Sequence, residues 1–283
     1  MLWVWLVLLY GIIKGMREIV KKKSMEKNTV LEVLFVYTLL SFLIVAPGAP
    51  KAGGVGYGTL LVIAFKSFVI FVAWLLSFRA IKKMPISLYG LLDLSRVIFS
   101  ILLGVIFLGE VMSFWQIVGL ALVCTGLFLC RVQKGEGGET PEKADTKMVC
   151  FALMSCFLNG VSGTMDKVLM KTVTSTQLQF WYMLFLVLFY VLYLLFSKTK
   201  IKLGSALKNY WIWILSILFV IGDKALFIAN QSGDSKVTIM TLLKQAGCIV
   251  TILAGKFLYK EKNITYKLFC AAVIITGMVV AVL

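Results

Sequence analysis

Ten hydrophobic segments follow one another along this chain, and they leave few residues for anything else. Each contains about 17–23 mostly apolar residues, enough for a helix to cross about 30 Å of hydrocarbon at 1.5 Å per residue. The segments span residues 2–19, 29–46, 58–78, 86–108, 112–130, 148–168, 177–197, 209–230, 237–258 and 264–283. This pattern predicts an all-α integral membrane protein with ten transmembrane helices.

Composition argues against several other classes of function. The chain is 60% hydrophobic and has a formal charge of +16, with Lys and Arg spread over many short loops. Basic residues that flank membrane spans explain this distribution better than nucleic-acid binding, which needs a basic patch. The sequence has no histidine, and its six cysteines form no CxxC motif. We therefore expect no metal site, no cofactor and no Ser-His-Asp or Cys-His catalysis.

The placement of Lys and Arg predicts the orientation of the chain in the membrane. The connections after the first, third, fifth, seventh and ninth segments are rich in both residues. The first of these connections carries Arg17, Lys21, Lys22, Lys23 and Lys27. The connections on the other side carry only Lys51, Lys171 and Lys236. By the positive-inside rule, the basic loops are cytoplasmic and both termini lie outside.

The two halves of the chain resemble each other, which indicates an internal repeat. At an offset of 151 residues the matched pairs are Leu91 and Leu242, Gly104 and Gly255, Glu110 and Glu261, Thr125 and Thr276, and Gly126 and Gly277. At an offset of 149 they are Gly11 and Gly160, Met16 and Met165, and Lys22 and Lys171. The pattern predicts a five-helix repeat at 1–130, a charged Gly-rich linker at 131–147 and a second five-helix repeat at 148–283. Because five is odd, the repeats are inverted in the membrane, as in several secondary transporters.

Short motifs at the ends of helices add a family resemblance. Gly109 and Glu110 follow one hydrophobic segment and open the next, which carries Gln116 and Gly119; the glutamate recurs at Glu261. Lysines close the first segment of each half, at Lys22 and Lys171. With ten helices in two halves, the chain resembles the drug/metabolite transporter superfamily, in particular its EamA-like branch. The resemblance implies a ten-helix basket with a central cavity between helices three, four, eight and nine, and transport of small metabolites.

Ionisable residues inside the predicted spans mark the candidate site. A charge at the centre of a membrane helix costs at least about 2.5–3.5 kcal/mol, so it usually faces a cavity or a partner. Most such residues here lie in the four helices that the resemblance places around the cavity. The predicted substrate-binding residues are Lys66, Asp93, Arg96, Asp223, Lys224, Lys244 and Gln245. Cations exceed acids in this set, which favours an anionic or zwitterionic substrate over a purely cationic one.

Alternative roles stay open for several of these charges. Asp93 and Arg96 are three residues apart on one helix, so they either neutralise each other as a structural pair or take part in the site. Asp93 and Lys244 hold equivalent positions in the two halves, which predicts that they face each other across the cavity. A structural role is expected for the charged residues nearer the ends of their segments, Lys14, Asp166 and Lys167.

These features together predict a secondary transporter that moves a small polar metabolite by alternating access. The substrate would carry a carboxylate or phosphate or be zwitterionic and amino-acid-like, and the resemblance favours export. No GxxxxGK[ST] phosphate loop occurs, so we expect no ATP hydrolysis by this chain. The alternatives are a membrane-embedded enzyme acting on lipid head groups and a non-transporting assembly or sensor protein. The expected partners are the substrate and the lipid bilayer of the cell membrane, without nucleic acid, for a monomer or homodimer that is not an enzyme.

Overall fold

Helices account for almost all of the described chain. The computed structural model describes residues 2–108, 113–132, 145–199, 201–231, 240, 243–244, 246–260 and 264–280. Its helices are α1 (Leu2–Ser24), α2 (Val30–Val45), η1 (Ala46–Lys51), α3 (Tyr57–Lys83), α4 (Ile86–Asp93), α5 (Arg96–Leu108), α6 (Phe114–Val132), α7 (Thr146–Leu169), α8 (Ser175–Ser197), α9 (Leu203–Lys208), α10 (Tyr210–Gln231), α12 (Ala246–Tyr259) and α13 (Ile264–Val280). These ranges contain no strand, and the all-α prediction is confirmed.

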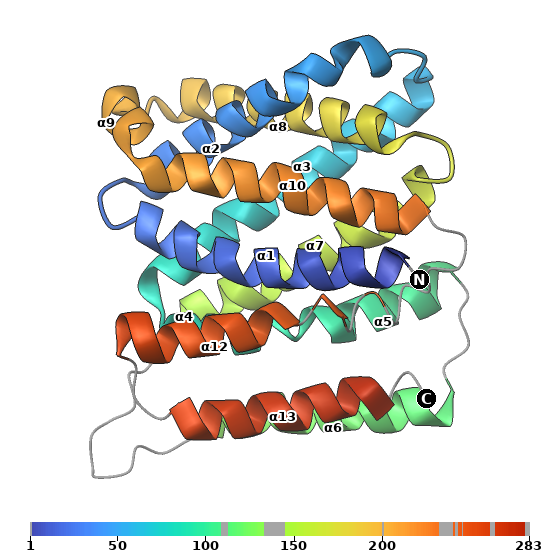
Figure 1. The fold of residues 1–283 in the computed structure, drawn as a ribbon, viewed down its shortest axis with the longest axis vertical. Helices are drawn as coiled ribbons and strands as arrows, with labels where there is room; N and C mark the ends of the chain where they lie inside the picture. The colour runs from blue at the N-terminus through green and yellow to red at the C-terminus, as the bar shows by residue number, and fades with distance from the viewer. Residues whose placement is uncertain are drawn as a thin grey trace.

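The long helices lie side by side, with their axes running across Figure 1. α1 lies between α10 and α12 and packs against both (Figure 1). α3 packs against α7 and α8, while α2 contacts α8 and α10. α6 and α13 pair with each other at one edge of the bundle, at the bottom of Figure 1. Most interior contacts therefore join helices from the first half of the chain to helices from the second half.

Within the described residues, five helical segments are long and apolar enough to cross a membrane. They are Val30–Lys51, Tyr57–Lys83, Thr146–Leu169, Ser175–Ser197 and Tyr210–Gln231. Shorter apolar helices cover Ile117–Gly126, Gly247–Tyr259 and Thr265–Gly277. α1 is 23 residues long, but charged side chains interrupt its apolar sequence. The prediction of ten spans is thus not confirmed, and the division into two inverted five-helix repeats stays a prediction.

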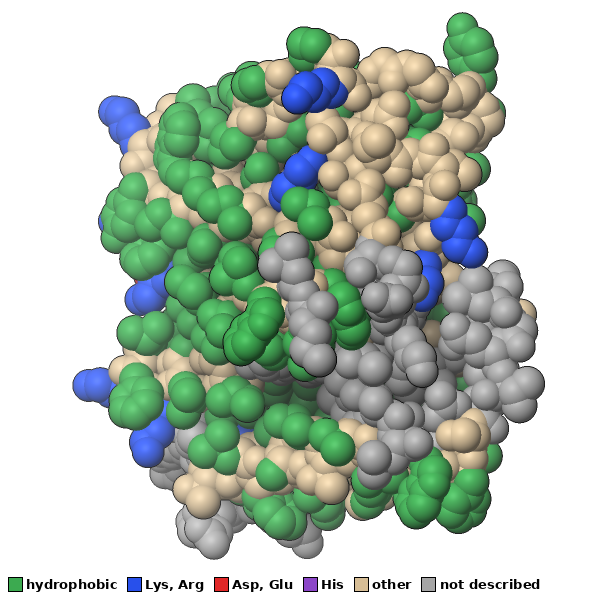
Figure 2. All heavy atoms as spheres, turned by 45° about the vertical axis from the view of Figure 1, so that its right-hand side comes forward, with side chains coloured by type: hydrophobic (Ala, Val, Ile, Leu, Met, Phe, Trp, Pro, Cys, Tyr) green, Lys and Arg blue, Asp and Glu red, His purple; other side chains and the backbone are tan. Residues whose placement is uncertain are grey.

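Large apolar side chains cover much of the outside of the bundle. α3 alone exposes Tyr57, Leu61, Phe65 and Phe68. Figure 2 shows apolar side chains over a broad area of one face, with Lys and Arg scattered among them. Soluble monomers rarely expose apolar surface on this scale. The surface is therefore suited to contact with lipid.

Capping boxes begin the second helix of each half. At the start of α2 the Thr29 hydroxyl accepts from the Glu32 N–H (3.3 Å), and Glu32 Oε2 accepts from the Thr29 N–H (2.9 Å). Thr174 and Gln177 make the same reciprocal pair at the start of α8. Each box satisfies backbone donors that the first turn of a helix leaves unpaired. These local sequences therefore fix where the two helices start.

The predicted continuous helix over 86–108 is wrong, because the chain breaks it into α4 and α5 at Leu94 and Ser95. Around the break the N–H groups bond three residues back, from Leu94 to Leu91 (3.1 Å) and from Ser95 to Leu92 (3.0 Å). The hydrophobicity of the segment does not predict such a break, because a tight turn can be built from the same residue types as a helix. The break lies between Asp93 and Arg96, the two charged residues of this segment.

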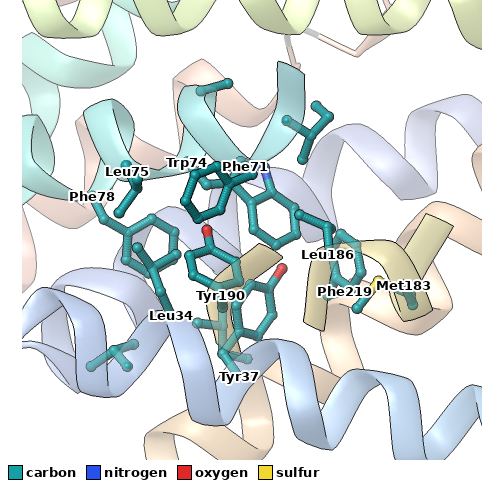
Figure 3. Close-up of a cluster of buried hydrophobic side chains, with 14 of the residues drawn as sticks. Leu34, Tyr37, Phe71, Trp74, Leu75, Phe78, Met183, Leu186, Tyr190 and Phe219 are labelled. Carbon is teal, nitrogen blue, oxygen red and sulfur yellow. The ribbon is translucent and has the colours of Figure 1, made fainter. Parts of the chain in front are cut away.

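An aromatic core holds α2, α3, α8 and α10 together (Figure 3). The Tyr37 ring lies 5.1 Å from Trp74 and 5.3 Å from Phe219, centre to centre, and Trp74 meets Phe219 edge-on at 5.2 Å. Tilted and edge-to-face contacts of this kind stabilise aromatic clusters beyond the area they bury. Trp74 and Phe219 also border the interior cavity, so the core sets the position of part of its wall.

Polar side chains tie together the end of the bundle that carries α9. Asn209 Nδ2 donates to the Ser24 carbonyl (3.0 Å) and to Asn28 Oδ1 (2.8 Å). The Lys202 N–H donates to Glu32 Oε1 (2.9 Å). These bonds join the end of α1 to the starts of α2 and α10, and they fix α1 against α10 at this end.

A close approach of α1 and α12 depends on glycine. A methyl group added at Gly15 would lie 2.6 Å from the Gly247 carbonyl oxygen and 2.9 Å from its Cα. We expect Gly15→Ala to lower the free energy of unfolding by about 1–3 kcal/mol, because the helices must separate. Thermal unfolding in detergent measures this loss of stability. Gly58→Ala is the control, because a methyl group added at Gly58 meets nothing within 4 Å. Equal melting temperatures for the two variants would contradict the predicted close packing.

Candidate functional site

A cavity of about 120 Å³ lies inside the bundle, between α1, α3, α4, α5, α7, α8 and α10. Its charged lining residues are Lys14, Arg17, Glu18, Lys21, Lys66, Arg96, Asp166, Lys167, Asp223 and Lys244. Cations outnumber acids in this lining by seven to three. Aromatic rings of Tyr10, Trp74, Tyr89, Tyr182, Phe219 and Phe227 also border it. Charged side chains gathered in membrane helices mark a candidate polar site.

Asp93 holds two of the cavity cations. Its Oδ2 forms an ion pair with Lys14 Nζ on α1, and its Oδ1 accepts from Arg96 Nη2 at 2.8 Å. Asp93 is buried and is not itself a lining residue. The Asp93–Arg96 pair predicted from the sequence therefore forms, but it includes Lys14 from a distant helix. One carboxylate compensates two cations here, which leaves a positive excess at this wall.

A second ion pair joins α1 to α10. Arg17 Nη1 lies 3.3 Å from Asp223 Oδ1, and both side chains are largely buried. The centre of the Arg17 guanidinium lies 4.6 Å from the centre of the Phe219 ring, in a cation–π contact. One turn further along α1, Lys21 Nζ donates to Glu18 Oε1 at 2.7 Å. The last two turns of α1 thus carry charge into the bundle and not into a loop.

A third ion pair joins α3 to α7. Lys66 Nζ lies 3.1 Å from Asp166 Oδ1 and 3.8 Å from the centre of the Tyr182 ring. Lys66 is only 2% exposed, although it is a lysine in the middle of an apolar helix. Burial of this completeness requires a compensating charge, and Asp166 supplies it.

Two of the inter-helix pairs, Arg17–Asp223 and Lys66–Asp166, occupy related positions in the two halves. Asp166 follows Arg17 by 149 residues, the same spacing that separates Gly11 from Gly160. Each lies on the first helix of its half and pairs with a helix of the other half, α10 for Arg17 and α3 for Asp166. The charges are reversed between the two pairs, so the first half provides the cation in both.

Lys244 differs from the other cavity cations. It forms no ion pair with any residue of the described chain, and its Nζ lies 6.0 Å from the centre of the Tyr10 ring. It is a described residue of the ninth predicted segment, and it precedes the start of α12 at Ala246 by two residues. Its charge is therefore the one most available to a bound anion.

The structure distributes the predicted site residues in three ways. Lys66, Arg96, Asp223 and Lys244 line the cavity, and Asp93 contacts two of its lining cations. Lys224 lies elsewhere and donates to Thr176 Oγ1 at 2.8 Å. Gln245 lies outside the described residues, as do the helix-opening glutamates Glu110 and Glu261. The expected Asp93–Lys244 contact is absent from the ion pairs of the described chain, where Asp93 meets Lys14 and Arg96 instead.

Sequence reasoning missed six charged residues of the cavity lining, among them Lys167, which was expected to have a structural role. Lys14 and Asp166 were expected to have structural roles near segment ends, and Arg17 and Lys21 were placed in a basic loop. Glu18 was not considered. Their spacing predicts a shared helix face, because Lys14, Arg17, Glu18 and Lys21 stand at positions i, i+3, i+4 and i+7. Continuing the first helix to Ser24 brings this face into the bundle.

The fold and its charged interior define an integral membrane protein with a polar cavity among apolar helices. Residues 1–132 match the model of the EamA-like transporter family, a family of membrane transporters within the drug/metabolite transporter superfamily. Over residues 1–132, this match confirms the resemblance inferred from the sequence motifs.

Similarity to solved structures supports the fold. A crystal structure of a protein aligns over 99% of this chain and 96% of its own, with a TM-score of 0.67 and 14% sequence identity. Identity at this level speaks for a shared architecture alone. No curated protein matches the sequence.

Proposed function

We propose that the protein is a secondary transporter that moves a small polar metabolite carrying a carboxylate or phosphate, zwitterions such as amino acids included. The observation that carries the proposal is the positive excess of the cavity, with Lys244 lacking a carboxylate partner among the described residues. Lys244 is half-buried. An ammonium partly removed from water without a counter-charge is costly, and a substrate anion would offset that cost. The proposed activity is movement of this anion from one side of the membrane to the other.

The helix contacts suit alternating access between the two predicted repeats. α1, the first helix of the first half, packs against α10 of the second half. α7, the first helix of the second half, packs against α3 of the first half. Each of these contacts contains one buried ion pair, Arg17–Asp223 or Lys66–Asp166. Rocking of one half against the other, the motion known from inverted-repeat transporters, would switch each ion pair between a closed and an open arrangement. We further propose that the protein works in the cell membrane, as an exporter, and as a monomer or homodimer.

Flux through reconstituted protein tests the proposal. In proteoliposomes containing the full chain, we expect at least one acidic or zwitterionic metabolite to cross faster than in protein-free liposomes. The amide of the same compound should cross more slowly, because it lacks the anionic group. A panel of amino acids, organic acids and sugar phosphates, each paired with an uncharged analogue, gives this measurement.

The same panel separates the alternatives. No flux for any member, with intact folded protein in the liposomes, would contradict transport and favour an enzyme acting on lipid head groups or a sensor. Equal flux for acids and their amides would retain transport but contradict the anionic substrate.

A further inference from the structure

We propose that Arg17 binds the anionic group of the substrate directly, through the guanidinium N–H groups that its partner Asp223 leaves unused. This inference rests on the proposed function and deepens it, since it names the recognising residue. Arg17 lines the cavity and is only 6% exposed. It is buried inside the bundle where a ligand, and not bulk water, would complete its bonds.

The hydrogen bonds of Arg17 are incomplete among the described residues. A guanidinium has five N–H donors and no acceptor. Arg17 makes one side-chain bond, from Nη1 to Asp223 Oδ1 at 3.3 Å. Its Nε is buried and has no hydrogen-bond partner in the described chain. A buried donor without an acceptor costs about 1–3 kcal/mol, so an acceptor that fills this position would bind favourably.

The wall behind Arg17 holds its guanidinium in place. Phe219 lies 4.6 Å from the guanidinium centre, and the Phe219 ring is itself packed against Tyr37 and Trp74 at 5.3 and 5.2 Å. An arginine supported by a fixed ring loses little freedom when it binds a ligand. The aromatic core of Figure 3, which contains all three rings, therefore prepares the arginine for binding.

The chemistry of the free donors selects an anion with two adjacent oxygens. Carboxylates and phosphates match the arginine fork with two parallel hydrogen bonds, whereas a lysine ammonium acts as a point charge. A neutral amide offers one oxygen and would satisfy the fork only in part. Lys244, on the same cavity, adds a second positive charge without this geometry.

Ligand-dependent thermal unfolding of the full-length protein tests the proposal without a known substrate. The probes are acetate, inorganic phosphate and neutral acetamide, each titrated at constant ionic strength against chloride. We expect acetate or phosphate to raise the melting temperature of the wild type saturably, and acetamide to leave it unchanged. The arms with acetate and phosphate separate a carboxylate site from a phosphate site.

The decisive variant is Arg17→Lys, which keeps the charge facing Asp223 but removes the fork. We expect its apparent dissociation constant for the active anion to rise at least about tenfold. Arg79→Lys, outside the cavity lining, is the matched control and should titrate like the wild type. Phe219→Leu, which leaves Arg17 in place without its supporting ring, should weaken binding to a smaller extent. The Phe219→Leu variant tests the proposal if Arg17→Lys fails to fold.

Three outcomes of the thermal titrations would overturn the proposal. They are wild-type-like titration of Arg17→Lys, wild-type-like titration of Phe219→Leu where Arg17→Lys does not fold, and the absence of stabilisation by either anion in the wild type. Flux measurements keep this result separate from the proposed function. Anion binding lost in Arg17→Lys without any wild-type flux would contradict transport alone, and acid-selective flux unaffected by Arg17→Lys would contradict the role of Arg17 alone.

Discussion

Replacing Lys66 by Met should destabilise the protein more than any other single change at the cavity. The substitution keeps much of the apolar volume but leaves Asp166 buried without the cation that lies 3.1 Å away. Removing one partner of a buried ion pair typically costs about 3–5 kcal/mol, since the remaining charge is uncompensated. The expected result is a large fall in melting temperature and in the yield of folded protein in detergent.

A double variant separates the loss of the pair from the loss of the lysine stem. Lys66→Met combined with Asp166→Asn removes both charges, so it should recover most of the stability lost by Lys66→Met alone. Lys51→Met, at an exposed position in η1, is the control for the substitution itself. If Lys66→Met alone were as stable as the wild type, another group would have to compensate Asp166. The Lys66–Asp166 ion pair would then not contribute to stability.

The fold was predictable from the sequence where hydrophobicity alone decides it. The boundaries expected for 29–46, 177–197 and 209–230 lie within two residues of α2, α8 and α10. The break between α4 and α5 was not predictable, since the segment is strongly apolar overall and its two charged residues, Asp93 and Arg96, are spaced as on one face of a continuous helix. Tertiary packing decides where a tight turn interrupts an apolar helix, and the hydropathy of the sequence does not indicate that position.

The cavity charges were only partly predictable, because hydropathy treats a lysine in a loop and a lysine in a buried ion pair alike. The first hydrophobic segment was ended at residue 19, before Lys21 to Lys23, yet α1 continues to Ser24. The helix continues because Arg17 and Lys21 find partners inside the bundle, in Asp223 and Glu18. Only the long-range contact of α1 with α10 reveals this, and no local pattern encodes the position of Asp223.

This correction also changes the charges available for the orientation argument. Arg17 and Lys21 are buried in the bundle, so they do not report on which side of the membrane the following loop lies. Lys22, Lys23 and Lys27 remain near the end of α1, and the asymmetry between the two sets of loops keeps its sign. The cytoplasmic assignment of the basic loops stays a prediction that rests on fewer charges.

Replacing Lys244 by Ala should have the opposite profile to Lys66→Met, with little change in stability and a large loss of transport. Lys244 has no ion pair in the described chain, so its removal leaves no carboxylate uncompensated there. A charge-assisted hydrogen bond contributes about 1.5–3 kcal/mol, which corresponds to roughly 10- to 100-fold in the affinity for an anion. We therefore expect at least a tenfold lower flux at subsaturating concentrations of the acidic substrate, on the order set by that bond energy. Lys244→Arg should retain part of the activity, since it keeps the charge.

Lys224→Ala provides the matched control, because Lys224 directly follows the lining residue Asp223 on α10 but donates to Thr176 Oγ1 instead of lining the cavity. Flux measured in proteoliposomes with equal amounts of folded protein should fall for Lys244→Ala and stay near wild type for Lys224→Ala. Wild-type flux in a well-folded Lys244→Ala protein would show that the excess charge of the cavity does not bind the substrate. The cavity cations would then be structural, and the carboxylates that pair with them would account for their presence.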